Sequence, residues 1–270
     1  MHYIRMHGAH VSPVSGRGGS VASVLQPQRL AAALEGTGPV TLVLGHGFCT
    51  GQDAWTAVRR ALRRPVRTIA FDYLGAGASG TAAWRAERYR TLHGHADDVI
   101  ALLDALDVRD AVFVGHSMSA AIGVMVRATA PERVGALALL AATPRYDDAA
   151  DGTYRGAFRP AELAEALALL DRDVAAWAGG VLPTLLGETT PRATVLALAT
   201  QLRGMRPDIA RDTARAIFGT DVRTLLGAID CPTLVLHADG DPTEPDHVRR
   251  WLTDALPHAT HRVIQGAGHL

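Results

Sequence analysis

A serine, an aspartate and a histidine follow one another along this sequence in the order that one class of acyl-transfer enzymes uses. The serine lies in the segment Gly115-His116-Ser117-Met118-Ser119, between an apolar run and a helical pattern. A sharp turn from strand to helix would lift the Ser117 hydroxyl above the sheet edge, where it can attack a carbonyl. Gly115 supplies the small residue that this turn needs before the serine. Ser119 stands after it where glycine is usual, and serine is small enough to fit there with some strain.

A serine nucleophile needs a base, and the end of the sequence offers one. His269 follows Gly268 on a glycine-rich segment behind the last apolar run. The segment 238–245 carries two aspartates, and we prefer Asp241 as the acid that orients the histidine. Asp239 remains the alternative, although it lies closer to the preceding strand, where an aspartate often caps a turn. The predicted catalytic residues are therefore Ser117, His269 as general base and Asp241.

Acyl transfer also needs hydrogen-bond donors that face the developing oxyanion, and these are usually backbone N–H groups. The segment Gly45-His46-Gly47-Phe48 follows the first central strand. Its glycine allows close approach of the backbone, so the N–H groups of Phe48 and Met118 can face one another as the predicted oxyanion hole. We expect three further side chains to line the substrate pocket: His46, His116 and Trp177.

Two other kinds of site fit the sequence less well. Residues 75–80 match the glycine-rich dinucleotide fingerprint, but no helical stripe begins until Leu92, whereas that fingerprint opens a helix directly. We therefore expect Asp72 to hold this loop as a structural carboxylate. No metal and no cofactor are predicted, because no acidic motif accompanies the histidines near the strand ends, His46, His116 and His237.

Short β-branched runs alternate with helical patterns from Pro39 onward, as in a parallel sheet flanked by helices. The predicted strands lie at 40–44, 66–73, 111–115, 134–140, 233–237 and 261–264. The predicted core helices lie at 53–62, 92–106 and 117–130. Between 140 and 233 the patterns predict only helices, at 160–170, 174–182, 191–205 and 208–218. The expected fold is therefore α/β, with a mostly parallel central sheet, helices on both faces and an inserted helical lid.

These patterns divide the chain into a flexible tail at 1–20, a core formed by 21–145 and 227–270, and a lid at 146–226. The tail has no continuous apolar segment of the kind that marks a signal peptide. No apolar run in the sequence reaches the roughly 20 residues that a membrane-spanning helix needs. We therefore expect a soluble, cytoplasmic protein.

The composition excludes several classes of protein. A chain of 270 residues with 48% hydrophobic and 20% charged residues can form one catalytic domain with a buried core. Its 27 basic and 27 acidic residues cancel, so no field of one sign draws nucleic acid or an anionic membrane to it. Cys49 and Cys231 are too few for a disulfide framework and lack metal-ligand spacing. We expect neither nucleic acid nor a membrane as a partner.

Motifs beyond the catalytic residues extend from about Val40 to His269. They are His46-Gly47-Phe48 with Gln52 and Trp55, Phe71-Asp72-Tyr73 with Gly75, Gly77 and Ser79, Arg88-Tyr89 with Thr91-Leu92 and Gly94, Asp97-Asp98-Val99, Phe113-Val114-Gly115-His116-Ser117, and Gly268-His269. Together they resemble the α/β hydrolases, and within them the RsbQ-like group, which includes a bacterial stress-signalling hydrolase and the plant strigolactone and karrikin receptors.

The resemblance implies an α/β-hydrolase fold with a V-shaped four-helix lid over a mostly hydrophobic pocket. It also implies slow hydrolysis of a small ester or lactone, coupled to signalling through a protein partner. The spacing from Asp241 to Pro245 matches the corresponding loop of the family. Members of the group continue past the histidine into a final helix, whereas this sequence ends at Leu270, so we expect either that the sequence is truncated or that one flank of the sheet near His269 lacks that cover.

The residues and the resemblance together predict a carboxylic-ester hydrolase that forms an acyl-enzyme on Ser117. A serine nucleophile argues against epoxide hydrolases and dehalogenases, whose ester intermediates need a carboxylate at that position. The alternative is a small-molecule receptor or signalling partner of the same fold with slow or no turnover. A nucleotide-binding oxidoreductase is a third and weaker hypothesis.

Overall fold

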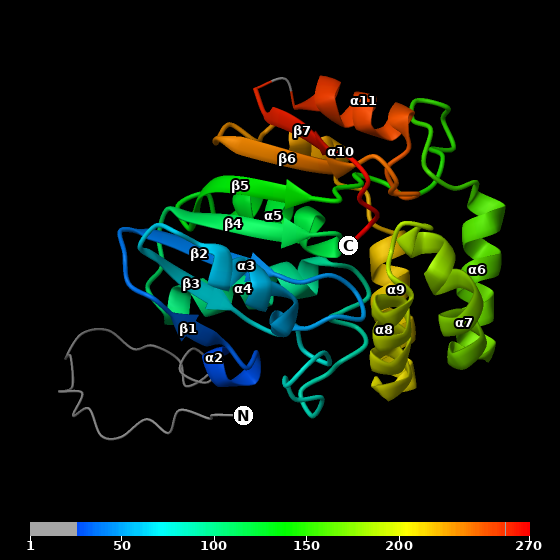
Figure 1. Cartoon of the computed structure of the whole chain (residues 1–270), viewed down its shortest axis with the longest axis horizontal. Helices are drawn as coiled ribbons and strands as arrows, with labels where there is room; N and C mark the ends of the chain where they lie inside the picture. Colours follow the sequence, from blue (N-terminus) through cyan, green and yellow to red (C-terminus); the bar gives the residue numbers. More distant parts are fainter. Residues whose placement is uncertain (1–25, 257) are drawn as a thin grey trace.

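A seven-stranded sheet forms the centre of the protein (Figure 1). The computed structural model describes residues 26–256 and 258–270, so the tail predicted for 1–20 lies outside the described residues. The strands follow the order β1-β3-β2-β4-β5-β6-β7, and only β1 and β3 pair antiparallel. Their bounds are β1 Ala33–Glu35, β2 Val40–Gly45, β3 Val66–Ala70, β4 Ala111–His116, β5 Val134–Leu140, β6 Thr233–Ala238 and β7 Thr260–Ile264. The predicted mostly parallel sheet is confirmed.

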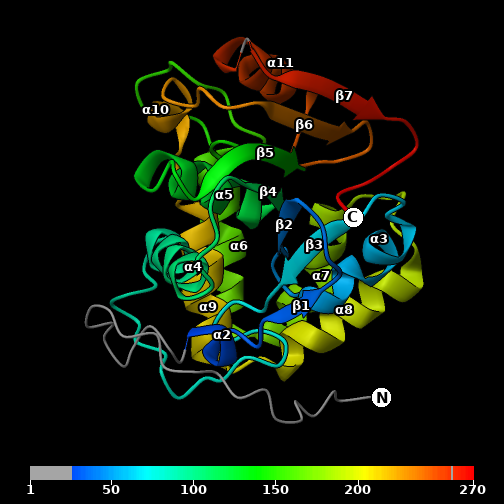
Figure 2. The same ribbon diagram turned by 90° about the vertical axis from the view of Figure 1, so that its left-hand side faces the viewer.

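Helices cover both faces of this sheet (Figure 2). Helices α4 and α5 lie on one face, where α5 packs against β4 and β5, and η1 with α3 lies on the other. The helices outside the segment between β5 and β6 are α2 Gln26–Arg29, η1 Gln52–Trp55, α3 Thr56–Ala61, α4 His93–Ala105, α5 Met118–Thr129 and α11 Asp246–Ala255.

The segment between β5 and β6 is helical, as its composition predicted. Its helices are α6 Pro160–Arg172, α7 Val174–Leu186, α8 Arg192–Gly204, α9 Pro207–Phe218 and the short α10 Arg223–Leu226. Helices α6 to α9 pack on one another and lie beyond the carboxyl ends of the central strands (Figure 1). Helix α9 buries one whole face, including Ile209, Ala214 and Ile217, against the rest of the molecule.

The strand order brings two loops together at the centre of the sheet. Strand β2 lies between β3 and β4, so the chain runs to one side of β2 and then crosses to the other. Open α/β sheets bind their ligands at such a switch point, outside the carboxyl ends of the strands. Gly45 at the end of β2 lies opposite Gly115 near the end of β4. The segments that follow these two glycines therefore start side by side.

The structure differs from the sequence prediction in several elements. Strand β3 ends at Ala70, and residues 71–73 continue outside the strand to a turn that begins at Leu74. The helix expected at 53–62 is split into η1 and α3, and of its expected apolar face only Trp55 is buried, whereas Val58 is 44% exposed. The elements β1, α2, α10 and α11 were not predicted.

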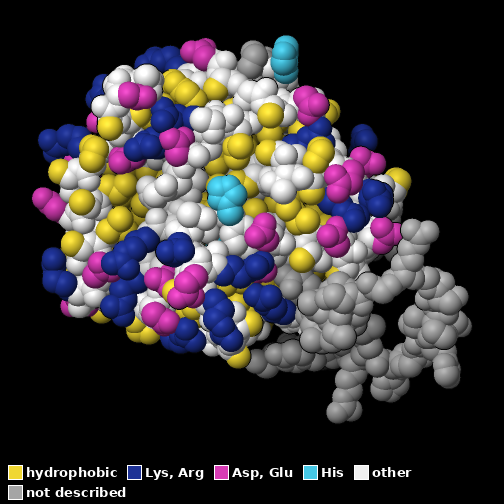
Figure 3. Space-filling view, turned by 180° about the vertical axis from the view of Figure 1, so that it is seen from behind, with side chains coloured by type: hydrophobic (Ala, Val, Ile, Leu, Met, Phe, Trp, Pro, Cys, Tyr) yellow, Lys and Arg dark blue, Asp and Glu magenta, His cyan; other side chains and the backbone are white. Residues whose placement is uncertain are grey.

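The surface carries both signs of charge. On the face shown in Figure 3, arginine and acidic side chains are interspersed among apolar ones. Within the described segments, no helix combines the length and the apolar character that crossing a membrane requires.

The packing of α5 on β4 predicts a stability effect at Gly123. A Cβ at this position would come within 2.6 Å of Phe113 Cδ1. Gly123→Ala should therefore lower the free energy of unfolding in urea by about 1–3 kcal/mol. Gly180→Ala in α7 is the matched control, because nothing lies within 4 Å of its added Cβ, and it should gain about 0.5–1 kcal/mol. Equal effects at the two positions would contradict this packing.

Candidate active site

Ser117 occupies the sharp turn between β4 and α5. Its φ of +57° and ψ of −120° are strained for a residue with a side chain, as expected of a nucleophile elbow. The Ser117 N–H donates to the Leu140 carbonyl at 2.8 Å, which ties the turn to β5. A Cβ on Gly115 would lie 2.3 Å from the Ser119 carbonyl oxygen, so only glycine fits there. The turn therefore presents the Ser117 hydroxyl at the carboxyl end of the sheet.

The three predicted catalytic side chains lie in contact. His269 Nε2 is 3.0 Å from Ser117 Oγ, and His269 Nδ1 is 2.8 Å from Asp241 Oδ2. An ionised carboxylate can only accept a hydrogen bond, so the imidazole proton lies on Nδ1 and the lone pair of Nε2 faces the serine. Asp239 does not take this place: its Oδ1 accepts a hydrogen bond from the Gly266 N–H at 2.8 Å.

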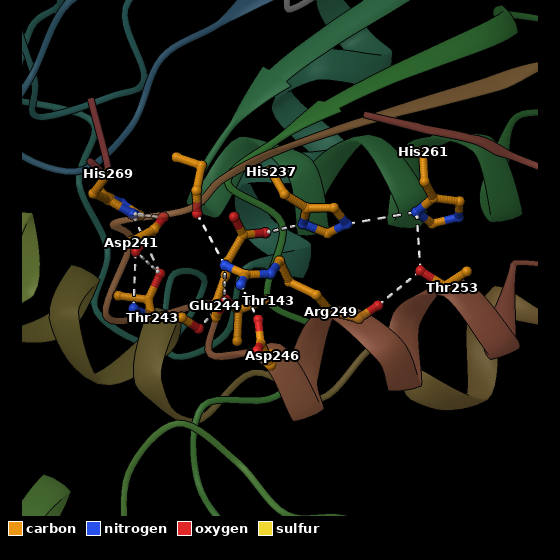
Figure 4. A network of polar contacts seen from close by, with 11 residues as sticks. Thr143, His237, Asp241, Thr243, Glu244, Asp246, Arg249, Thr253, His261 and His269 are labelled. Atoms are coloured by element: carbon orange, nitrogen blue, oxygen red, sulfur yellow. Dashed lines mark hydrogen bonds and ion pairs between the residues drawn. The ribbon is translucent and has the colours of Figure 1, made fainter. Parts of the chain in front are cut away.

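Asp241 is nearly fully buried, yet its environment favours the charged form. Burial acts to raise its pKa, but hydrogen bonds from His269 and Thr243 outweigh this, so the pKa of Asp241 lies below its ordinary value. Both the N–H and the hydroxyl of Thr243 donate to Asp241 Oδ1 at 2.8 Å (Figure 4). The carboxylate is therefore ionised when it contacts the histidine.

The loop that carries Asp241 is held by buried polar groups (Figure 4). Arg249 Nη1 donates to the carbonyls of Ala238 at 3.0 Å and Glu244 at 2.9 Å. Glu244 Oε1 lies 2.9 Å from His237 Nδ1, and both side chains are buried. Thr143 fixes the far side of the loop by donating to the Thr243 carbonyl at 2.8 Å. His237, considered above as a metal ligand, therefore pairs with a carboxylate that supports this loop.

The segment after β2 approaches the nucleophile closely. A Cβ on Gly47 would lie 3.4 Å from Ser117 Cβ and 2.7 Å from His116 Nδ1, so the backbone passes directly beside the turn. Phe48 lines the same cavity as Ser117. Met118 is the first residue of α5, so its N–H has no partner within the helix.

The cavity beside Ser117 is small and mostly apolar. Its volume is about 50 Å³, and side chains from α7, α8 and α9 form half of its wall. Trp177 lines it and packs edge-on against Phe48 with ring centres 6.3 Å apart. His116 also lines it, whereas the buried His46 lines the adjoining cavity, which shares His116 with this one, and its Nε2 accepts from the Tyr73 N–H at 3.2 Å.

His116 contacts the backbone of the predicted base. Burial lowers the pKa of His116 to about 4, so its ring is neutral at physiological pH. A carbonyl can only accept, so the single ring proton lies on Nε2 and is donated to the His269 carbonyl at 2.7 Å. The elbow thereby holds the loop of His269.

Tyr146 was missed by the sequence analysis. It lines the cavity beside Ser117 and is nearly fully buried. Burial raises its pKa, which keeps the hydroxyl protonated. No local pattern marks it, because it lies on an irregular segment after β5 that only the fold brings to the cavity.

Hydrogen bonds hold Asp72 and the loop that follows it. Asp72 accepts hydrogen bonds from the Gln52 N–H at 2.7 Å and the Ala78 N–H at 2.8 Å, so its predicted role in holding the loop 75–80 is confirmed. That loop opens no helix, since the next one is α4. In the two described ranges, 26–256 and 258–270, no cluster of three His, Cys, Asp or Glu side chains could hold a metal ion.

A parallel sheet with this elbow and a Ser–His–Asp contact is the architecture of the hydrolases considered above. Residues 40–270 match the model of the alpha/beta hydrolase fold family. The chain belongs to this family and is an α/β hydrolase.

Named relatives agree with the expected subgroup. The chain is 31% identical to a strigolactone esterase of Arabidopsis thaliana over 90% of either chain. It is 33% identical to a karrikin insensitive 2 receptor of Petunia hybrida, with 87% of each chain covered. A hydrolase from Oleispira antarctica has a similar structure, with a TM-score of 0.87 and 27% identity over 92% of this chain and 90% of that one. The resemblance to the strigolactone and karrikin receptor group is confirmed.

Proposed function

We propose that this protein is a serine hydrolase that cleaves a small hydrophobic ester or lactone. The observation that carries the proposal is the continuous contact from Asp241 through His269 to Ser117, at 2.8 and 3.0 Å. As Ser117 Oγ attacks the carbonyl carbon, its proton passes to His269 Nε2. Asp241 stabilises the imidazolium that forms, and His269 then protonates the leaving oxygen.

The second half of the reaction uses the same groups. His269 takes a proton from water, which attacks the acyl-enzyme carbonyl and releases the acid and the serine. The N–H groups of Phe48 and Met118 stabilise the oxyanion in both steps. Tyr146 lines the same cavity as Ser117, and burial raises the pKa of its hydroxyl, which keeps it protonated.

The cavity favours a small substrate. Its volume of about 50 Å³ leaves room for only a small group beside Ser117. Residues 146–226 act in this proposal as a lid, because α7, α8 and α9 supply the apolar wall. A short acyl chain or a compact lactone therefore fits better than a long chain.

The free thiols of Cys49 and Cys231 agree with a reducing, cytoplasmic location.

A second function is favoured by the names of the relatives. Several of them are receptors, and the identity of 33% to one of these covers most of both chains. In this alternative the cavity binds a small ester or lactone, turnover is slow, and the helical layer α6–α9 contacts a signalling protein. Fast multiple turnover of simple esters would support the first function, and a single slow acylation event would support the second.

Ser117→Ala tests the proposed function directly. The native protein should hydrolyse p-nitrophenyl acetate, and a fluorophosphonate probe should add one label to Ser117, read by intact mass spectrometry. The variant should lose the label and fall to the rate of the buffer, because the attacking oxygen is gone. Ser79→Ala is the matched control and should behave as the native protein. Folded native protein that neither reacts with the probe nor turns over would contradict the proposal.

Asp241→Asn and Asp239→Asn separate the two aspartates. Asp241→Asn should lower kcat by roughly three to four orders of magnitude, because the amide no longer holds the productive tautomer of His269. Asp239→Asn loses only a turn contact to Gly266 and should keep kcat within about threefold. Circular dichroism should show both variants folded. Unchanged turnover in Asp241→Asn would remove it from the catalytic assignment.

The cavity predicts a dependence on acyl length. The kcat/KM for p-nitrophenyl acetate should exceed that for the octanoate by ~10-fold or more, because the longer chain does not fit the apolar wall. Leu182→Ala enlarges the cavity and should shift the preference toward longer acyl chains. Leu170→Ala removes a buried side chain that does not line the cavity and should leave the preference unchanged. Identical chain-length profiles in all three proteins would contradict the assignment of this cavity.

A further inference from the structure

Ser119 stands where the usual elbow has glycine, and its side chain is fully buried. Its Oγ lies 2.5 Å from the His46 carbonyl oxygen and 2.7 Å from the Tyr73 hydroxyl. A carbonyl can only accept, so the single Ser119 proton goes to His46 and the Tyr73 hydroxyl donates to Ser119. A directed hydrogen-bond chain therefore runs from Tyr73 through Ser119 to the backbone of His46.

This chain ends on the loop that carries the Phe48 N–H. The next carbonyl of that loop, at Gly47, accepts hydrogen bonds from Thr50 Oγ1 and from His46 Nδ1, each at 2.8 Å. Burial lowers the pKa of His46, which favours the neutral ring. Because His46 Nε2 accepts from the Tyr73 N–H, the single ring proton lies on Nδ1. Both carbonyls that precede Phe48 are thus held.

The planar peptide bond makes the direction of the Phe48 N–H depend on the contacts of the Gly47 carbonyl. The Gly47 carbonyl and the Phe48 N–H belong to one planar trans peptide and point in opposite directions. Holding the carbonyl therefore sets where the N–H points. The bond from Ser119 to His46 joins this loop to the first turn of α5, whose Met118 N–H is the other proposed oxyanion donor. Ser119 thus ties the first turn of α5 to the peptide immediately before the one that carries the Phe48 N–H.

The end of β2 is shaped around this contact. A Cβ on Gly45 would lie 2.8 Å from Ser119 Oγ and 3.0 Å from the Tyr73 hydroxyl. Because Gly45 has no side chain, the Ser119 and Tyr73 hydroxyl groups can occupy the space beside the end of the strand. Ser119 itself does not line the cavity beside Ser117, so any effect on a substrate passes through the loop.

We propose that Ser119 is a positioning residue that aligns the Phe48 N–H with the Met118 N–H to form the oxyanion hole. The proposal rests on the acyl-transfer function proposed above. In this proposal the serine that replaces the usual glycine contributes to transition-state stabilisation, and the Tyr73 hydroxyl orients that serine by donating to it.

The test compares Ser119→Ala with the native protein in turnover and in binding of a tetrahedral-intermediate analogue. We expect kcat for p-nitrophenyl acetate to fall roughly 10- to 100-fold with KM nearly unchanged, less than the ~10²–10³ of deleting a donor outright. A small methyl trifluoromethyl ketone adds Ser117 Oγ to its carbonyl carbon while the serine proton passes to His269. Its Ki should rise by the same factor as kcat/KM falls, whereas the Ki of the corresponding secondary alcohol should not change.

Tyr73→Phe and the double variant show whether the effect runs through one chain. Tyr73→Phe keeps the bond from Ser119 to His46 and should lower kcat less than Ser119→Ala. The double variant should match Ser119→Ala alone, because the hydroxyl that Tyr73→Phe removes contacts the loop through Ser119, whereas the Tyr73 N–H bond to His46 is kept. Independent, multiplicative losses would overturn the directed chain.

A matched control separates positioning from loss of stability. Thr68→Ala also removes a buried hydroxyl that donates to a backbone carbonyl, that of Glu35 at 3.3 Å, but at the edge of the sheet. It should leave kcat and the ketone Ki unchanged. A Ser119→Ala protein with native kcat and ketone Ki, or with lower kcat and native ketone Ki, would overturn the proposal. If native turnover does not depend on Ser117, the proposed function itself fails, so the two failures are distinguishable.

Discussion

The close approach of β2 and β4 at Gly45 and Gly115 is the contact on which the rest of the site depends. Added Cβ atoms at these two glycines would lie 2.8 Å and 2.3 Å from atoms of Ser119. Because neither strand carries a side chain there, α5 begins directly against both strand ends. The strained φ of Ser117 is then supported by surrounding packing and by the Ser117 N–H bond to Leu140. The sheet itself therefore sets the position of the nucleophile relative to the loop after β2.

Local patterns predicted much of this arrangement, since β-branched runs and helical stripes reflect burial that each element achieves by its own face. Strand β5 was predicted at its observed bounds, whereas β1 is too short and too exposed to carry a pattern. Helix α11 was missed although its buried Val248 and Leu252 lie one turn apart, because polar residues outnumber apolar ones along it. Of the four elements that were not predicted, β1, α2 and α10 have only three or four residues, too few to show a periodic pattern.

The candidate site also contains residues that local patterns predicted and residues that they did not. Chain order and turn chemistry led to Ser117, His269 and Asp241, but two aspartates in one short loop could not be separated by spacing alone. Their roles differ through tertiary contacts: Thr243 and the histidine surround Asp241, whereas Asp239 meets the Gly266 backbone. Tyr146 reaches the cavity from an irregular segment and has no sequence signature. His46 was expected in the substrate pocket, but it lines the adjoining cavity and not the one beside Ser117, and its Nε2 is bonded to the Tyr73 N–H.

The two halves of the site meet at the base, and the helical layer holds one side of it. The His269 N–H donates to the Leu186 carbonyl at the end of α7 at 3.3 Å, while His116 holds the His269 carbonyl from the elbow. Leu186 also lines the cavity. A substrate that displaces the end of α7 therefore shifts the carbonyl to which the base is bonded, whereas a substrate that fits leaves the His269 contacts to Ser117 and Asp241 intact. The wall that selects the substrate and the backbone that positions the base are thus the same turn of helix, which couples shape recognition to proton transfer.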